Sequence, residues 1–241
     1  MPPHRPSVFL EKLVASRNGG PQQSVVNELR RVVLNGDVPP GTPVPLSEVA
    51  DLLGVSHIPV REALKTLTGE GLVTHRPNAG YSVAQLTAQE LREMYIVGES
   101  LEAAALAVSV HRATEEDRAA AVAANQRLAQ AIIDGDGAAY QRESRNFHMA
   151  LARPSGMQRL LRMLDMAWNM IEPVQPMVHV DSDHWTKLNI DHDEMLVAFL
   201  ARDSERLLAA TTRHAHRLND VIATFPSDTG LLAEDETSQL D

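Results

Sequence analysis

The sequence contains no cysteine, which excludes disulfide bonds and metal sites built on thiolates. It also lacks any apolar run of the roughly 18 residues that a membrane-spanning helix needs. The N-terminus has no apolar stretch of the kind that marks a signal peptide. From these absences we expect a cytoplasmic protein with no membrane partner.

Positive charge is scarce as well: 22 Lys and Arg face 32 Asp and Glu, for a net charge of −10. The deficit is confined to one part of the chain. Residues 1–85 carry eight Lys and Arg against seven Asp and Glu, whereas residues 86–241 carry 14 against 25. Because nucleic acid repels acidic surfaces, only the first part remains a candidate for binding it. A chain of 241 residues can form one large domain or two modest ones.

The stretch from Leu46 to Val83 reads as helix, tight turn, helix and β-hairpin, the order of a winged helix-turn-helix. A packed face of the second helix is predicted by apolar residues at i, i+3, i+4 and i+7, namely Val60, Ala63, Leu64 and Leu67. A second face carries His57, Arg61 and Lys65, one turn apart. One face can therefore pack while the other meets an acidic polymer.

Local residues support this interpretation of the helix pair. Gly54 can adopt the positive φ that ends the first helix, and Ser56 is a good N-cap whose hydroxyl can accept the Ile58 amide. An ordinary capped helical hairpin would show the same features. The basic turn of residues 76–80, between strand-like residues 72–75 and 81–83, favours a DNA-binding wing, with Gly80 allowing a positive φ.

After Val83 the pattern is helical, and it is broken at Asp134-Gly135, at residues 154–156 and at residues 173–176. The expected helices span residues 87–112, 115–134, 137–152, 155–171, 183–201 and 203–224. We predict a mainly α protein with a winged helix-turn-helix and its small β-hairpin wing at residues 21–84, followed by an all-helical bundle at residues 87–224. Residues 1–20 read as a mobile arm and residues 225–241 as an acidic disordered tail.

Three histidines lie within the predicted helices of the bundle: His148, His192 and His214. Neutral imidazoles on facing helices can bind a divalent transition metal such as zinc or nickel. Scattered helical histidines are more often surface residues or hydrogen-bonded core residues. Both interpretations remain open on the residues alone.

The segments GVSHIPVREAL and GEGLVTHRPNAGYSV resemble the DNA-binding domain of the GntR family of bacterial transcription regulators. Most of the recognition helix fits the family's pattern, but His57 and Ile58 replace its usual residues, so we expect an operator that differs from the usual one. The resemblance and the exposed helix face together imply DNA contacts by Ser56, His57, Arg61, Lys65, Arg76 and Gly80.

The segment NFHMAL, followed by SGM, is similar to the FCD effector domain of the FadR-like subfamily, and the similarity spans roughly residues 87–222. It implies a metal site at His148, His192 and His214, where the metal and a nearby Arg hold the carboxylate of a small organic or sugar acid. Ser144 stands where metal-binding members carry Asp or Asn, and Gly98 stands where they carry Arg. Our candidate effector contacts are Ser144 and Arg145, with Arg142 as an alternative to Arg145, and Glu143 is a possible substitute metal ligand.

We therefore predict a ligand-responsive transcription regulator that binds a near-palindromic operator in double-stranded DNA as a homodimer. Repression is the commoner outcome in the family, and a small carboxylate is the expected effector. Two alternatives are a metal-dependent enzyme acting on a small carboxylate and a regulator whose helical domain has lost its metal. The enzyme lacks a convincing general base, because most of the carboxylates flanking His192 are expected to face away from a metal: Asp191, Asp193 and Glu194.

Overall fold

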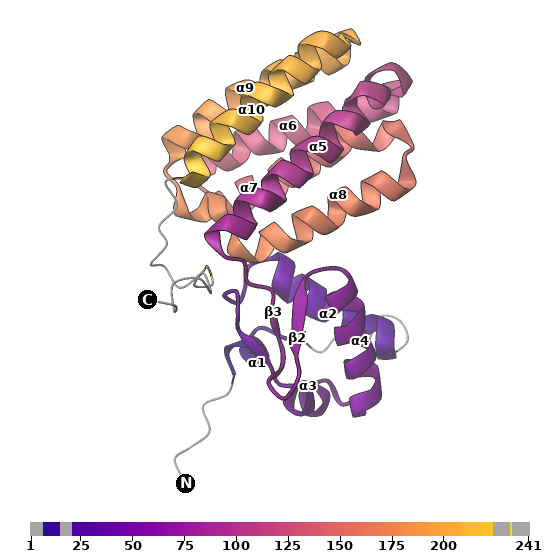
Figure 1. The fold of residues 1–241 in the computed structure, drawn as a ribbon, viewed down its shortest axis with the longest axis vertical. Helices are drawn as coiled ribbons and strands as arrows, with labels where there is room; N and C mark the ends of the chain where they lie inside the picture. The colour runs from indigo at the N-terminus through magenta and orange to yellow at the C-terminus, as the bar shows by residue number, and fades with distance from the viewer. Residues whose placement is uncertain (1–6, 15–20, 224–231, 233–241) are drawn as a thin grey trace. The chain divides into compact units, whose positions relative to one another are not determined.

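The computed structural model describes residues 7–14, residues 21–223 and Leu232 (Figure 1). Contacts divide the chain into a first unit, formed mainly by Met1–Ala88 with Asn169–Val174, and a second unit formed by Gln89–Trp168 and Gln175–Pro226. We call them the N-terminal unit and the helical unit. Within the described ranges, none of the helices is long and apolar enough to cross a membrane.

The described part of the N-terminal unit has four helices around one apolar core. The helices are α1 (Val8–Glu11), α2 (Pro21–Leu34), α3 (Leu46–Leu53) and α4 (His57–Gly69). Helix α4 packs against α2 through the face that its apolar spacing predicts, and Val60, Ala63, Leu64 and Leu67 are all fully buried. The predicted packing face of the second helix is therefore confirmed.

The turn between α3 and α4 follows the prediction in its backbone but not in its cap. Gly54 ends α3 in the left-handed conformation with φ 66°, and its N–H bonds back to the carbonyls of Ala50 and Asp51. Ser56 occupies the N-cap position of α4, yet its hydroxyl makes no capping hydrogen bond. The prediction that this hydroxyl accepts the Ile58 amide is therefore wrong, and the exposed Ser56 hydroxyl has no role in capping α4.

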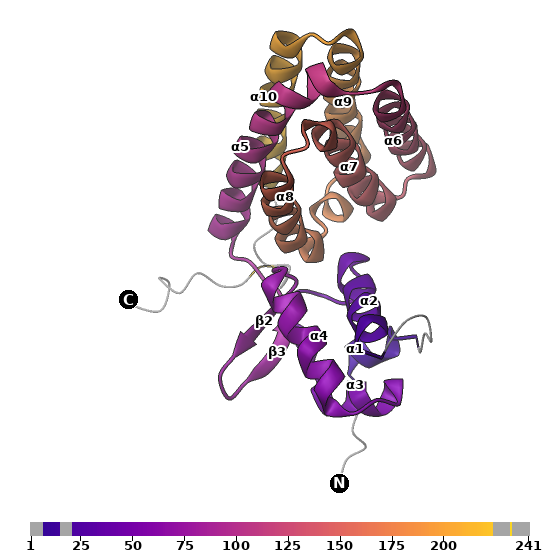
Figure 2. The same cartoon turned by 90° about the vertical axis from the view of Figure 1, so that its right-hand side faces the viewer.

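The wing is part of a three-stranded antiparallel sheet of order β1-β3-β2, formed by β1 (Pro43–Val44), β2 (Val73–Arg76) and β3 (Gly80–Val83). Figure 2 shows the β2–β3 hairpin beside α4. Arg76 pairs with Gly80 across the hairpin, so the predicted turn of residues 76–80 shortens to residues 77–79, with Asn78 at φ 65°. The sequence did not predict β1, because a strand of two residues has no recognisable periodicity.

Part of the predicted mobile arm is packed. Phe9 of α1 is fully buried in the core of the N-terminal unit, and the Val14 amide donates a 2.6 Å hydrogen bond to the Glu28 carboxylate on α2. Residues 7–14 therefore belong to the folded unit rather than to an arm, because a buried aromatic ring anchors them. The rest of the predicted arm, residues 1–6 and 15–20, lies outside the described residues. So does the predicted tail, apart from Leu232.

The helical unit is an all-helical bundle, as predicted. Its α-helices are α5 (Ala88–Arg112), α6 (Glu115–Asp134), α7 (Gly137–Ala152), α8 (Gln158–Ile171), α9 (Ser182–Ala201) and α10 (Ser204–Ala223). Short 3₁₀ helices occupy the breaks in the chain at Arg153–Ser155, Glu172–Val174 and Pro176–His179, of which Glu172–Val174 is assigned by its contacts to the N-terminal unit. Neighbouring helices pair α6 with α7 and α9 with α10, and α9 also packs on α6 and α7 (Figure 1). This packing brings residues far apart in the sequence into one core.

Replacing Phe9 with Ala tests whether residues 7–14 stabilise the N-terminal unit. We expect the free energy of unfolding of this unit to fall by about 3–5 kcal/mol, because a fully buried aromatic side chain is lost. The matched control is Val8→Ala, at a neighbouring residue that is 51% exposed, and it should change stability by less than about 0.5 kcal/mol. Urea unfolding followed by circular dichroism would measure both variants, and equal small effects would contradict the packing of Phe9.

Candidate DNA-binding surface and histidine cluster

The exposed face of α4 carries the residues predicted to contact DNA. His57, Arg61 and Lys65 are all exposed, and Ile58 between them is 71% exposed. The Lys65 ammonium lies 2.8 Å from the Glu62 carboxylate. Exposed ion pairs of this kind contribute little to protein stability. Lys65 can therefore exchange Glu62 for a phosphate at a small cost in free energy.

An open groove lies between α4 and the sheet. Arg61 lines it from α4, and His75, Gly80 and Tyr81 line it from the wing, together with Ala79 and residues 43–46. The His75 and Tyr81 rings are in contact, with centroids 4.5 Å apart. Of the predicted DNA contacts, Arg61 and Gly80 therefore share this groove. Ser56, His57, Lys65 and Arg76 are exposed but are not among the residues that line it.

The three predicted histidines meet in the core of the helical unit, where α7 supplies His148, α9 supplies His192 and α10 supplies His214. All three are buried, with exposures of 3%, 0% and 4%. Their ring centroids lie 5.1 Å (His148–His192), 5.1 Å (His148–His214) and 4.4 Å (His192–His214) apart. One nitrogen from each ring falls within 4.8 Å of the others, so the cluster has the compactness of a metal site.

The spacing of two of these nitrogens fits a tetrahedral zinc ion. Nε2 of His148 lies 3.3 Å from Nε2 of His192. Zinc binds imidazole nitrogen at about 2.0–2.1 Å, so two ligands of a tetrahedral site stand about 3.3 Å apart. Three histidine ligands also leave one coordination position for water or another ligand. The residues present therefore fit a divalent transition metal.

A carboxylate that the sequence did not single out as a site residue contacts one of the three histidines. Glu102 of α5 is 6% exposed, and its Oε1 lies 2.6 Å from Nδ1 of His148. A detectable signal for it was present, because Glu102 falls on the buried stripe of α5 that includes Tyr95, Leu106 and Ser109. A charged residue at helical spacing among buried positions indicates a specific partner in the core.

Burial keeps two of the histidines neutral. It lowers the pKa of His192 well below its usual value, and the neighbouring His214 and His148 lower it further. The pKa of His214 is also well below its usual value, because of burial first and then because of the charges of His148 and Arg217. Among the described residues, Nδ1 of His192 and Nδ1 of His214 are buried without a hydrogen-bond partner. A neutral imidazole, which offers a lone pair on one ring nitrogen, is the form in which histidine binds a metal.

A small cavity of about 10 Å³ adjoins the cluster and is lined by His192, His214 and Ser144, together with Tyr95, Tyr140, Gln141, Trp168, Met177, Leu188 and Leu218. This volume is close to that needed for one water molecule. Of the two predicted effector contacts, Ser144 lines the cavity. Arg145 is not among the lining residues, and its guanidinium instead binds Asp165 on α8 at 2.6 Å.

The other candidates near the cluster are engaged elsewhere. Glu143 binds Arg127 at 2.7 Å and Arg142 at 3.4 Å. The three carboxylates that flank His192 are paired too: Asp191 binds Arg217, Asp193 accepts a hydrogen bond from Asn125, and Glu194 binds Arg213. None of the three belongs to the metal-competent cluster found among the described residues. A general base for metal-assisted catalysis is therefore not provided by these flanking carboxylates.

Comparisons with known proteins agree with this arrangement. Residues 21–83 match the family described as bacterial regulatory proteins, gntR family, and residues 93–217 match the FCD domain. YdhC of Bacillus subtilis, an uncharacterized HTH-type transcriptional regulator, is 28% identical over 154 residues, which cover 64% of this chain and 66% of YdhC. A probable D-xylose utilization operon transcriptional repressor of Paenarthrobacter nicotinovorans is 32% identical over 142 residues, covering 58% of this chain and 59% of that protein.

The HTH-type transcriptional regulator McbR of Escherichia coli is 27% identical over 192 residues, which cover 75% of this chain and 83% of McbR. The McbR structure shares the fold, with a TM-score of 0.75 at 23% identity over 85% of this chain and 98% of that chain. The two family matches cover consecutive segments that include the helix-turn-helix and the histidine cluster. The chain therefore belongs to the GntR family of bacterial regulatory proteins and carries an FCD domain, which makes it a DNA-binding transcription regulator rather than an enzyme.

Proposed function

We propose that this regulator acts as a metal-dependent sensor of a small organic or sugar acid, and that it represses transcription as a homodimer on a near-palindromic operator. The observation that carries the proposal is the compact, buried cluster of His148, His192 and His214. The cluster supports a binding site for a divalent cation, zinc or a similar ion such as nickel, held by three neutral imidazoles. The open coordination position would accept the carboxylate of the effector.

The small size of the adjoining cavity means that binding of an effector would involve a conformational change. A volume of about 10 Å³ holds one water but not an organic acid. Effector binding would therefore require lining side chains such as Trp168 or Met177 to move. A ligand that binds only the opened arrangement shifts the population toward it, and such a shift can alter DNA affinity.

The DNA contacts proposed for the N-terminal unit are Ser56, His57, Arg61 and Lys65 on α4, with Arg76 and Gly80 on the wing. Their exposure and the shared groove of Arg61 and Gly80 support this assignment. In a homodimer, two α4 helices would enter successive major grooves of the operator. Arg61 has a side chain suited to bidentate recognition of guanine.

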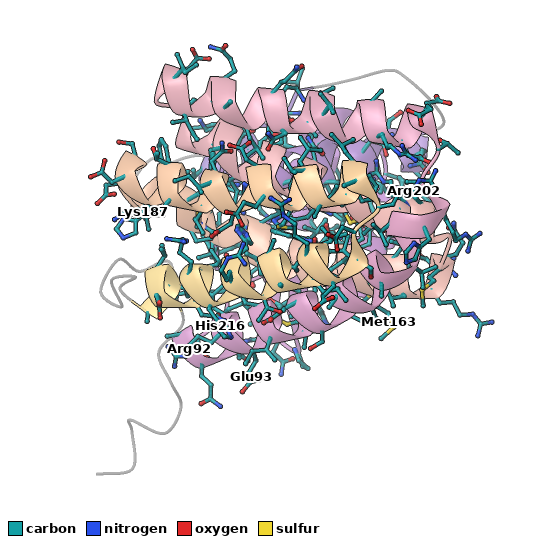
Figure 3. The ribbon with its side chains drawn as sticks, turned by 90° about the horizontal axis from the view of Figure 1, so that it is seen from above. Arg92, Glu93, Met163, Lys187, Arg202 and His216 are labelled. Atoms are coloured by element: carbon teal, nitrogen blue, oxygen red, sulfur yellow. The ribbon has the colours of Figure 1, made fainter. Side chains whose placement is uncertain are left out.

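The homodimer is supported by exposed apolar side chains on two neighbouring helices. Ile96 and Val97 of α5 are 56% and 42% exposed, and Met163 and Met166 of α8 are 58% and 43% exposed. Helices α5 and α8 pack together through a shared core cluster, and Figure 3 shows Met163 at the surface of the helical unit. Exposed apolar side chains on neighbouring helices are candidates for a protein interface.

Replacing Arg61 with Ala tests the proposed base contact. Affinity for an operator selected from random DNA should fall by about 1–3 kcal/mol, and base preference should relax at one position of each half-site. The matched control is Arg206→Ala, which removes an equally charged, exposed residue from the helical unit. Fluorescence anisotropy at fixed salt measures both variants. Unchanged affinity and specificity in Arg61→Ala would remove this residue from the contacts.

The metal site is tested by replacing His192 with Ala. The purified wild-type protein should bind one zinc per chain and gain about 2.7 kcal/mol of stability at a free zinc concentration 100-fold above its Kd. Both effects should be lost in His192→Ala. His216→Ala is the control, because His216 lies two residues from His214 but is exposed on α10 (Figure 3). Equal zinc content in all three proteins would contradict the site and favour a regulator that senses without a metal.

A double replacement of Val97 and Met163 with Glu tests the dimer surface. The wild-type protein should sediment as a dimer, and the variant as a monomer with weakened operator binding, because two charges would be buried at the interface. The control is Val197→Glu, at a position on α9 that is 49% exposed. If the double variant sediments like the wild type, the interface lies elsewhere.

A further inference from the structure

Glu102 is a buried carboxylate that contacts a histidine of the cluster but is not itself one of the candidate metal ligands. It comes from α5, whereas the three histidines come from α7, α9 and α10. Its Oε1 lies 2.6 Å from Nδ1 of His148, and both side chains are almost fully buried, with exposures of 8% and 3%. The other ring nitrogen of His148, Nε2, is the atom that faces His192. Glu102 therefore binds His148 on the side opposite to the cluster.

We propose that Glu102 is a positioning residue that holds His148 in the one tautomer whose Nε2 lone pair points into the histidine cluster. An ionised carboxylate can only accept hydrogen bonds, so Nδ1 of His148 must carry the proton. Nε2 of neutral His148 is then free to bind a cation. The inference rests on the proposed metal site and assigns it a residue from a fourth helix.

The same contact orders the hydrogen bonds of the cation-free cluster. When His148 is neutral and its Nδ1–H faces Glu102, its Nε2 carries the lone pair, so Nε2 of His192 donates the hydrogen bond that joins them at 3.3 Å. Nδ1 of His192 then carries a lone pair instead of a proton. This agrees with its lack of a hydrogen-bond partner among the described residues. His148 is thus oriented for a cation in advance, whereas His192 has to transfer its proton to Nδ1 before it can bind.

Glu102 also supplies charge that the ligands lack. Three neutral imidazoles leave a bound dication uncompensated in a buried site, where an unpaired charge is costly. The neighbouring buried carboxylates Asp191 and Glu143 are already paired with Arg217 and Arg127. Within the described ranges, Glu102 contacts the imidazole of His148 and no Lys or Arg side chain. The charge of Glu102 is therefore available to offset a cation at the cluster.

The test is a zinc titration of the metal-free, full-length protein in competition with a chromophoric chelator. Glu102→Gln keeps the size of the side chain and a carbonyl acceptor but removes the charge, and Glu102→Leu also removes the acceptor. We expect zinc affinity to fall about 10- to 100-fold in Glu102→Gln and at least as far in Glu102→Leu. Glu143→Gln is the matched control, because it removes a buried carboxylate of α7 that contacts arginines instead of the cluster.

A second measurement separates positioning from a merely structural role. Nitrogen-15 NMR of the histidines reports which ring nitrogen carries the proton. His148 should be in the Nδ1–H form in the wild type, and that form should no longer dominate in Glu102→Leu. Wild-type zinc affinity in both Glu102 variants, or an unchanged His148 tautomer in Glu102→Leu, would overturn the assignment of Glu102. If the wild type itself binds no zinc, the metal site and this inference both fail, which distinguishes the two results.

Discussion

The helical unit depends on the burial of polar groups that only the tertiary fold can satisfy. Three imidazoles and a carboxylate lie in its core, supplied by α5, α7, α9 and α10. Buried polar groups without partners destabilise a fold, so this arrangement constrains how the four helices pack. Nδ1 of His192 and Nδ1 of His214 are buried without a hydrogen-bond partner among the described residues. The residues of the site therefore also affect the stability of the bundle.

The N-terminal unit meets a different constraint, since it must pack one face of α4 while leaving the other free. Four fully buried apolar residues at helical spacing fulfil the first requirement, and the exposed row of His57, Arg61 and Lys65 fulfils the second. The groove shared by Arg61 and the wing adds a second element to the same surface. The net charge of this unit is close to zero, whereas the remainder of the chain is acidic. An acidic surface would repel DNA, so the near-neutral unit is the one that can approach it.

An effector bound in the helical unit would affect DNA binding by the N-terminal unit through its preference for one conformation. A ligand changes DNA affinity only if it prefers one conformation of the protein. The cavity beside the cluster is too small for an organic acid, so side chains would have to repack for one to bind there. Trp168 of α8 and Met177 of the 3₁₀ helix Pro176–His179 are among the side chains that line this cavity.

The sequence by itself determined the helix-turn-helix, the wing and the helical bundle, because apolar periodicity, helix caps and turn residues are local and need no partner. It also named the three histidines, although their spacing in the chain could not show that they meet. Only the tertiary structure decided that Glu102 faces His148, that Arg145 is held by Asp165, that Ser56 does not cap α4 and that Phe9 is buried. These contacts join residues from separate elements or depend on the detailed orientation of one side chain, and local sequence patterns carry no record of either.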